Sequence, residues 1–224
     1  MDDGRENIGY IIQNLRATYG EPKLKRERDP LDELIRTILS QSTTDVNTDR
    51  AFAGLKARFP TWEQARRARA SSIEKAIRSG GLSRQKSVRI KEILNEIHRR
   101  RGNLDLSFLC RISLEEAVEF LSSFKGVGPK TVACTLLFSC KKHKIFPLDV
   151  HIFRICRRLG LIPQKCSDEY AHQLMTELVP KDKHTEAHIN LIRHGRKICR
   201  PNNPRCDQCC LIDYCQYARE MLRS

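Results

Sequence analysis

Apolar residues recur along this chain at intervals of three and four residues, which is the spacing of one face of an α-helix. No stretch alternates apolar and polar residues for long enough to predict a β-strand. The sequence therefore predicts an all-α fold of helices joined by short loops. The expected helices cover residues 7–19, 30–39, 44–58, 62–68, 72–78, 84–101, 113–124, 152–159 and 167–178.

Several helix boundaries are marked by residues that start or stop helices. Asp29 and Pro30 are typical of the first positions of a helix. Ser113, followed three residues later by Glu116, has the pattern of a capping box. Gly160 comes directly after the apolar stretch that ends at residue 159, so it marks the end of that helix.

A glycine hairpin is predicted between the helix that follows Ser113 and the next helix. Gly126 and Gly128 are one residue apart and permit a turn that side chains would block. Pro129 suits the first position of a new helix, which we expect to begin there or at Lys130. The free N–H groups of the hairpin and of this helix can bind a phosphate without using any side chain.

The charge balance indicates what such a protein binds. Its 224 residues include 41 Lys+Arg and 27 Asp+Glu, a formal net charge of +14. Since neither an exposed apolar helix nor a lipidation signal accompanies this charge, nucleic acid is favoured over a membrane as partner. Residues 1–6 lack the pattern of a signal or transit peptide, and no apolar run approaches membrane-spanning length. We therefore expect an intracellular protein, in the cytoplasm and nucleoid of a prokaryote or the nucleus of a eukaryote.

Ten cysteines without a secretory signal favour metal or redox chemistry over disulfides. Six, two and five residues separate the members of a C-terminal group, which consists of Cys199, Cys206, Cys209 and Cys215. Four closely spaced thiolates need a metal to offset their repulsion, and the residues alone leave zinc and a [4Fe–4S] cluster open. At least some of the isolated cysteines are expected to be buried small hydrophobes. The isolated cysteines, which have no ligand spacing, are Cys134, Cys140, Cys156 and Cys166.

Three features together resemble a known family. Residues 126–133, Gly-Val-Gly-Pro-Lys-Thr-Val-Ala, resemble the helix-hairpin-helix of the base-excision DNA glycosylases. Residues 147–154 resemble the loop and helix that follow it in the endonuclease III branch, and the C-terminal cysteines resemble its iron–sulfur loop position for position. The resemblance implies that those four cysteines hold a [4Fe–4S] cluster and that the adjacent Cys210 is a bystander.

The resemblance also implies an architecture of two helical domains. One is a six-helix domain at residues 29–142 that contains the hairpin. The other combines residues 1–28 with residues 143–224 and carries the cluster. DNA is expected to lie in the cleft between the two.

By the same resemblance, Lys130 is the candidate nucleophile and Asp149 the candidate carboxylate for proton handling. A lysine amine can attack the sugar carbon of a damaged nucleotide, expel the base and form a Schiff base, from which β-elimination releases the 3′ phosphate. Lys130 must first lose its proton, which desolvation and the positive end of a helix favour. Asp149 would stabilise the positive charge that develops on the sugar. Without the resemblance, Asp149 is interpreted as a helix N-cap and Lys130 as a solvated lysine.

Two loops are expected to contact DNA, because an enzyme that flips a nucleotide out of a duplex has to fill the gap. In the first loop the family's hole-filling glutamine aligns with Ser42, while Gln41 lies one position earlier, so both are candidates. In the second, Leu82 is the candidate wedge, and a leucine packed in the core is the alternative. Arg84 and Lys86 are expected to face phosphates. The expected DNA contacts of the hairpin are Lys125, Gly126 and Gly128.

The resemblance implies a bifunctional base-excision DNA glycosylase with apurinic/apyrimidinic (AP) lyase activity on damaged or oxidised pyrimidines. Its expected partner is double-stranded DNA with a damaged base or an abasic site, bound by a monomer. One alternative is a glycosylase that is monofunctional or has a different base specificity. The other is a catalytically silent helix-hairpin-helix protein that only binds DNA.

Overall fold

The structure, a computed structural model, describes residues 4–22, 28–140 and 142–221. Every regular element of these residues is an α-helix or a short 3-10 helix, and none is a strand, which confirms the all-α prediction. None of the described helices is both long and apolar enough to cross a lipid bilayer.

The chain divides into two compact units. We call Glu27–His143 the hairpin unit, and Met1–Arg26 together with Lys144–Ser224 the cysteine unit. The division expected from the sequence had the same order along the chain, with the limits of its first domain at residues 29 and 142.

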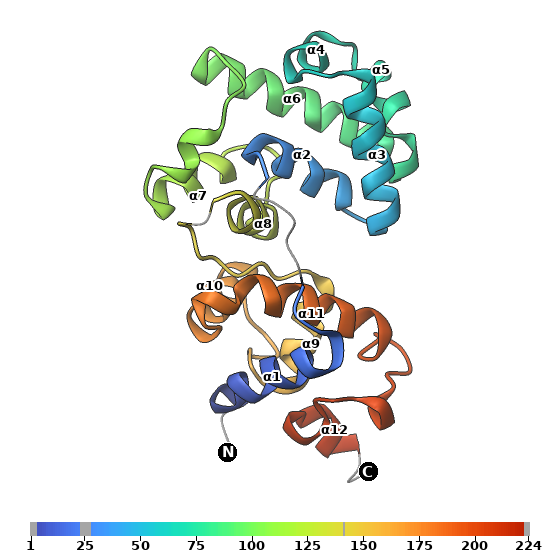
Figure 1. Ribbon diagram of the computed structural model, residues 1–224, viewed down its shortest axis with the longest axis vertical. Helices are drawn as coiled ribbons and strands as arrows, with labels where there is room; N and C mark the ends of the chain where they lie inside the picture. Colours follow the sequence, from blue (N-terminus) through green and yellow to red (C-terminus); the bar gives the residue numbers. More distant parts are fainter. Residues whose placement is uncertain (1–3, 23–27, 141, 222–224) are drawn as a thin grey trace. The chain divides into compact units, whose positions relative to one another are not determined.

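The hairpin unit is built around helix α2, which packs against α8 and against α3 (Figure 1). Leu34, Ile35 and Ile38 of this helix are fully buried, so α2 supplies the centre of the core. The elements of the unit are α2 (Pro30–Ser40), α3 (Asp45–Arg58), α4 (Trp62–Arg67), α5 (Ala70–Ala76), η2 (Arg78–Gly80), α6 (Ser83–Arg101), η3 (Ser107–Cys110), α7 (Leu114–Ser122) and α8 (Pro129–Ser139).

Two helix starts that the sequence predicts are confirmed in this unit. The Asp29 carboxylate accepts hydrogen bonds from the backbone N–H groups of Leu31 and Asp32, both at 3.0 Å. Ser113 and Glu116 form the expected capping box, with hydrogen bonds of 3.1 and 2.9 Å. Each cap satisfies N–H groups that the first turn of a helix leaves without a partner.

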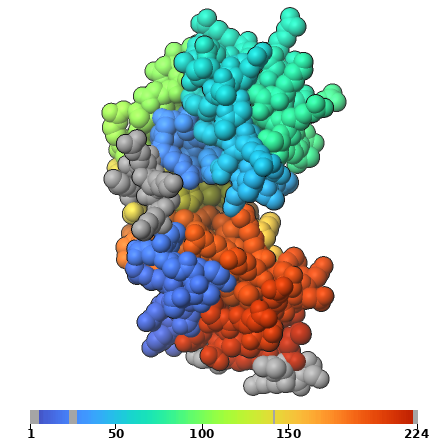
Figure 2. Space-filling model, turned by 45° about the vertical axis from the view of Figure 1, so that its right-hand side comes forward, coloured from blue at the N-terminus to red at the C-terminus, as the bar shows by residue number. Residues whose placement is uncertain are grey.

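The cysteine unit joins the beginning of the chain to its end, because α1 packs against α11 (Figure 1). In the space-filling view the N-terminal residues lie directly against the C-terminal ones (Figure 2). Helix α11 also packs closely on α9, since a Cβ at Gly195 would lie only 2.8 Å from the Cβ of His151. The elements are η1 (Gly4–Asn7), α1 (Ile8–Tyr19), α9 (Val150–Leu159), α10 (Asp168–Leu178), η4 (Lys181–Lys183), α11 (His184–Lys197), η5 (Cys206–Gln208), η6 (Ile212–Tyr214) and α12 (Gln216–Met221).

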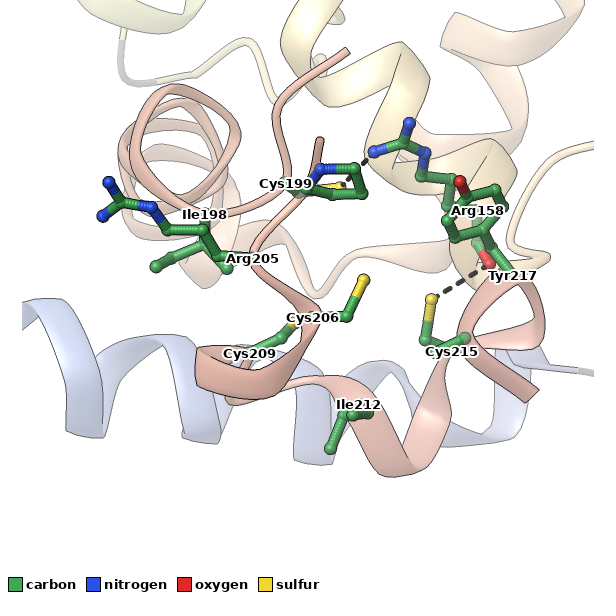
Figure 3. Close-up of a pocket in the computed structure, with 11 residues that line it drawn as sticks. Arg158, Ile198, Cys199, Arg205, Cys206, Cys209, Ile212, Cys215 and Tyr217 are labelled. Carbon is green, nitrogen blue, oxygen red and sulfur yellow. Dashed lines mark hydrogen bonds between the residues drawn. The ribbon is translucent and has the colours of Figure 1, made fainter. Parts of the chain in front are cut away.

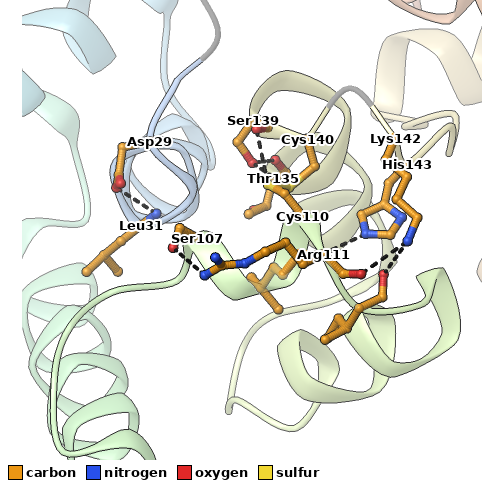
Figure 4. Close-up of a disulfide and its surroundings, with 12 residues drawn as sticks. Asp29, Leu31, Ser107, Cys110, Arg111, Thr135, Ser139, Cys140, Lys142 and His143 are labelled. Carbon is orange, nitrogen blue, oxygen red and sulfur yellow. Dashed lines mark hydrogen bonds between the residues drawn. A yellow bond between two sulfur atoms is a disulfide. The ribbon is translucent and has the colours of Figure 1, made fainter.

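Cys140 is buried, but it is not a free cysteine. Cys140 forms a disulfide with Cys110 and thereby joins η3 to the residue that follows α8 (Figure 4). Cys134 and Cys156 are buried as expected, whereas Cys166 is partly exposed. The pair could not be found from spacing, because its members are 30 residues apart and only the packing of η3 on α8 brings them together.

Hydrogen bonds hold the same turn beside the disulfide (Figure 4). The Lys142 amine donates to the carbonyl groups of Arg111 and Ile112, both at 3.2 Å. The His143 ring donates from Nε2 to the carbonyl oxygen of Leu109 at 2.7 Å. The turn after η3 is therefore fixed to the end of α8 by noncovalent contacts as well.

We expect the disulfide to stabilise the hairpin unit by about 2–4 kcal/mol, because it closes a long loop and so restricts the unfolded chain. Trp62 is the only tryptophan of the sequence and belongs to α4, so its fluorescence reports on unfolding of this unit. Reduction of the wild type should lower the urea concentration at the unfolding midpoint, as followed by Trp62 fluorescence. In Cys110→Ser the same midpoint should be equal with and without reductant. Equal midpoints for the oxidised and reduced wild type would contradict the crosslink.

Candidate functional site

The hairpin before α8 presents backbone N–H groups without acceptors. Gly126 has a φ of +78°, a left-handed conformation that glycine adopts without strain, and Gly128 is the N-cap of α8. Among the described residues, no acceptor binds the N–H groups of Gly126, Gly128 or Lys130, and Pro129 has no N–H. These groups are therefore available to an external acceptor such as a phosphate oxygen.

Lys130 follows Pro129 in the first turn of α8, as the sequence predicts, and its side chain is half-buried. Within the part of the chain that the structure describes, its amine has no hydrogen-bond or ion-pair partner. No intramolecular carboxylate therefore competes for this amine, and it can contact a group bound at the N–H groups of the hairpin.

Asp149 is the N-cap of α9, which confirms the interpretation made from the residues alone. One carboxylate oxygen, Oδ1, accepts hydrogen bonds from the N–H groups of His151 and Ile152, both at 2.9 Å. The second oxygen, Oδ2, has no hydrogen-bond donor among the described residues. The cap therefore orients the carboxylate while leaving one oxygen for chemistry. Asp149 belongs to the cysteine unit and Lys130 to the hairpin unit.

The two loops that the sequence assigns to gap filling both contain strained backbone. Ser42 and Leu82 have φ values of 53° and 49°, in the left-handed region that residues with bulky side chains rarely adopt. The loops are close to each other, because a Cβ at Gly81 would lie 3.9 Å from the carbonyl oxygen of Ser42. Leu82 is 53% exposed, so it is not the core leucine of the alternative interpretation. Such strain often accompanies functional positions.

Gln41 and Ser42 lie in different environments. Ser42 is exposed, whereas the amide oxygen of Gln41 accepts a hydrogen bond from Arg89 at 3.0 Å. Arg89 also packs on the hairpin, since a Cβ at Gly126 would collide with its side chain. Arg89 thus connects the first loop with the hairpin, a role that no local pattern in the sequence indicates.

The structure corrects the expectation for Lys86. Its side chain is only 2% exposed, and its amine donates hydrogen bonds to the carbonyl groups of Leu39 and Gly80, both at 2.7 Å. Burial also lowers the pKa of this amine. Lys86 therefore joins the segments before the two gap-filling loops and is not available to a phosphate. The sequence does contain the signal, because Lys86 lies one helical turn before Ile90, on the buried face of α6.

Most other basic residues of α6 are also bound within the unit. Lys91 donates to two carbonyl groups at the end of α4, and Glu96 pairs with both Arg99 and Arg100. Arg84, by contrast, is exposed, and its guanidinium has no hydrogen-bond or ion-pair partner among the described residues. Arg84 is therefore free to bind an external anion.

An open groove lies between α6 and the hairpin. Arg84 and Arg89 contribute positive charge from α6, and the exposed Lys125 contributes it from the hairpin. The complete lining consists of Arg84, Gln85, Val88, Arg89, Glu92 and Lys125. This basic surface adjoins the free N–H groups of the hairpin.

The four cysteines of the C-terminal group line one narrow cavity of about 20 Å³ (Figure 3). Their neighbours in the wall include Arg158, whose Nη1 donates a hydrogen bond to the Cys199 sulfur at 3.3 Å. Among the described residues, no group of three or more Cys, His, Asp or Glu side chains surrounds a point suited to a single metal ion. Cys210 does not line the cavity, in keeping with its interpretation as a bystander.

The chemistry of this cavity suits a group that takes several thiolate ligands. Burial raises the pKa of the Cys209 thiol to about 12 and also raises that of Cys215, so binding of a metal by these thiols would release protons. The guanidinium of Arg158 stabilises negative charge at Cys199. Four soft sulfur donors with a cation beside them fit an iron–sulfur cluster.

Comparison with known proteins assigns most of the chain to a family. Residues 35–181 match the family described as HhH-GPD superfamily base excision DNA repair protein. An endonuclease III of Thermotoga maritima is 31% identical over 198 residues, which are 88% of this chain and 88% of that protein. The chain belongs to the HhH-GPD superfamily of base excision DNA repair proteins. It is thus an enzyme of the DNA glycosylase class.

Other relatives of this glycosylase extend the comparison. A putative DNA glycosylase of Arabidopsis thaliana is 44% identical over 173 residues, which cover 77% of this chain but 58% of that protein. The fold is similar to that of endonuclease III in a non-covalent complex with DNA, with a TM-score of 0.82, 21% identity and coverage of 98% of this chain and 99% of that one.

Replacement of the buried Lys86 amine should destabilise the hairpin unit. In Lys86→Met the carbonyl groups of Leu39 and Gly80 lose their donor, which should cost about 1–3 kcal/mol. Arg84→Met, two residues earlier and exposed, is the matched control and should change stability by less than about 0.5 kcal/mol. Urea unfolding followed at Trp62 measures both. Equal stability of the two variants would show that the Lys86 amine does not hold the loops.

Proposed function

We propose that this glycosylase is bifunctional: it excises a damaged base and then cleaves the DNA strand as an AP lyase, through a Schiff base on Lys130. The observation that carries the proposal is the Lys130 amine. It has no partner among the residues that the structure describes, and it lies beside N–H groups of the hairpin that none of those residues binds. Those N–H groups can hold a DNA phosphate and so bring the adjacent sugar to the amine.

In the proposed reaction the Lys130 amine attacks C1′ of the damaged nucleotide, and the bond from C1′ to the base breaks. The amine loses a proton, the C1′–O4′ bond of the sugar ring breaks and O4′ takes up a proton, which gives the iminium. This iminium loses a proton from C2′, and the 3′ phosphate departs as the leaving group. The Oδ2 oxygen of Asp149, which no described residue binds, is suited to accept and return protons during these steps. Its negative charge also stabilises the cationic sugar.

The proposed substrate is duplex DNA that carries a damaged or oxidised pyrimidine or an abasic site. Leu82, exposed on strained backbone next to Ser42, is suited to enter the stack when a nucleotide is flipped out. Arg84 and Lys125 supply positive charge without competing partners for the phosphate backbone. Pyrimidine damage is the substrate class that the resemblance to the endonuclease III branch implies.

The proposal includes a [4Fe–4S] cluster held by Cys199, Cys206, Cys209 and Cys215. The shared cavity and the hydrogen bond from Arg158 support it. When bound, the cluster supplies a covalent crosslink for a loop with little regular structure and a centre that can change its redox state. Nearby Lys197, Arg200 and Arg205 would be held in place with this loop for contact with the DNA backbone.

Borohydride trapping tests the Lys130 mechanism, because only a Schiff base is reduced to a stable protein–DNA adduct. With a duplex that carries an abasic site, we expect an adduct from the wild type and none from Lys130→Ala. Lys125→Ala is the matched control, since it removes an exposed lysine of the same hairpin that is not the nucleophile. Asp149→Asn should cleave the strand about 10²–10⁴-fold more slowly.

The result distinguishes the alternatives. Absence of an adduct from a wild type that binds the abasic duplex would exclude the Schiff base. Base release would then indicate a monofunctional glycosylase, and its absence a protein that only binds DNA. An adduct that persists in Lys130→Ala would move the nucleophile to another amine.

Iron and sulfide analysis tests the cluster. Cys206→Ala should lose iron and the broad visible absorbance of the cluster, and the neighbouring bystander variant Cys210→Ala should keep both, because Cys210 does not line the cavity. Zinc in place of iron in protein purified without oxygen would contradict the assignment. Equal loss of iron in the two variants would contradict the choice of ligands.

A further inference from the structure

The segment before Asp149 has no regular structure, yet its backbone is closely held. Phe146 and Leu148 are 0% and 3% exposed, so the backbone polar groups of this segment need partners inside the cysteine unit. No neighbouring strand or helix backbone supplies them among the described residues. Side chains of α10 and α11 do so instead.

Three hydrogen bonds hold the segment. The N–H of Phe146 donates to Thr176 Oγ1 at 2.9 Å, and the N–H of Leu148 donates to His172 Nε2 at 3.1 Å. From α11, His188 Nδ1 donates to the carbonyl oxygen of Pro147 at 3.0 Å. Pro147 itself has no N–H, so the N–H groups of residues 146–148 are all accounted for.

The spacing of the two α10 residues matches the extended segment. His172 and Thr176 are four residues apart on one face of α10, and Thr176 Oγ1 donates to the His172 carbonyl at 2.7 Å, which leaves its oxygen oriented to accept from Phe146. His172 Nδ1 lies 2.8 Å from the Asp168 carbonyl, which can only accept. The proton of the neutral ring therefore sits on Nδ1, and Nε2 is the acceptor that Leu148 requires.

We propose that His172 and Thr176 are positioning residues for Asp149. Their side chains accept hydrogen bonds from the N–H groups of Phe146 and Leu148, which precede Asp149 in the chain. The first N–H groups of α9, which follow Asp149, bind its carboxylate. The backbone of Asp149 is thereby fixed by α10, and its free Oδ2 has one defined location. This inference rests on the proposed role of Asp149 and adds the residues that make that role possible.

Thr176 offers a matched pair of variants. Thr176→Val has nearly the same shape but cannot accept from Phe146, whereas Thr176→Ser keeps the hydroxyl. We expect Thr176→Val to lower the single-turnover rate of strand cleavage at an abasic site by about 10–100-fold, because a shift of about 1 Å in a catalytic group can cost about 100-fold. Thr176→Ser should stay near the wild-type rate, and the Kd for abasic duplex should be unchanged in both.

His172 provides an independent variant if Thr176→Val folds poorly. Glutamine places its amide oxygen close to the position of Nε2, so His172→Gln should retain most of the rate, and His172→Leu should lose it to the same extent as Thr176→Val. Far-UV circular dichroism and iron content identify variants in which the cysteine unit is intact. Rescue by glutamine would separate loss of the hydrogen bond from loss of packing.

A double-mutant cycle with Asp149→Asn decides whether the effect acts through Asp149. If it does, Thr176→Val slows the wild type but causes no further loss in Asp149→Asn. An equal loss of rate from Thr176→Val in both backgrounds overturns the positioning role. Equal rates for Thr176→Val and Thr176→Ser, with Asp149→Asn slow, overturn it as well. Both outcomes leave the proposed function unaffected. A wild-type rate for Asp149→Asn overturns the proposed role of Asp149 and this inference with it.

Discussion

The first turn of every α-helix leaves backbone N–H groups without partners, and the candidate chemistry of this protein depends on how two helices satisfy them. At α9 the chain supplies an acceptor, because Asp149 caps the helix with one carboxylate oxygen. At α8 it supplies none, since Gly128 has no side chain and Pro129 no N–H. The start of α9 thus orients a carboxylate, whereas the start of α8 stays open to a phosphate and carries Lys130 beside it. The need of the first-turn N–H groups for acceptors therefore accounts for both the fixed carboxylate of Asp149 and the candidate phosphate site at α8.

Buried polar groups determine the shape of the surface around these helix starts. The Lys86 amine holds the carbonyl groups of Leu39 and Gly80, so the two strained loops that follow are kept next to each other. Arg89 continues this connection to the hairpin through Gln41. Burial of a charged amine costs free energy unless its N–H groups donate hydrogen bonds. The two hydrogen bonds of the Lys86 amine meet this requirement and stabilise the exposed loops. The cation that remains for an external anion on this part of α6 is Arg84.

In the cysteine unit, too, polar side chains hold segments that have little regular structure. Its C-terminal loop has little regular structure, and its four cysteines share one cavity whose wall includes the cationic Arg158. In the segment before α9, side chains of α10 and α11 take the place of a neighbouring strand for the backbone before Asp149. In both places irregular chain is held by side chains from helices. The position of functional residues outside helices is thus set by helices that do not carry them.

The sequence by itself determined the features that depend on neighbouring residues. Helical periodicity, the caps Asp29 and Ser113, the glycine hairpin and the spacing of the four cysteines are all local, and the structure reproduces the helices and caps they predict. Only the tertiary structure decided that the Lys86 amine binds the Leu39 carbonyl, that Arg89 binds Gln41 and that Cys110 pairs with Cys140. These contacts join residues about 30 or more positions apart, and each depends on which helix faces pack together. A local pattern carries no record of that packing, so the residues that position the site emerged only from the folded chain.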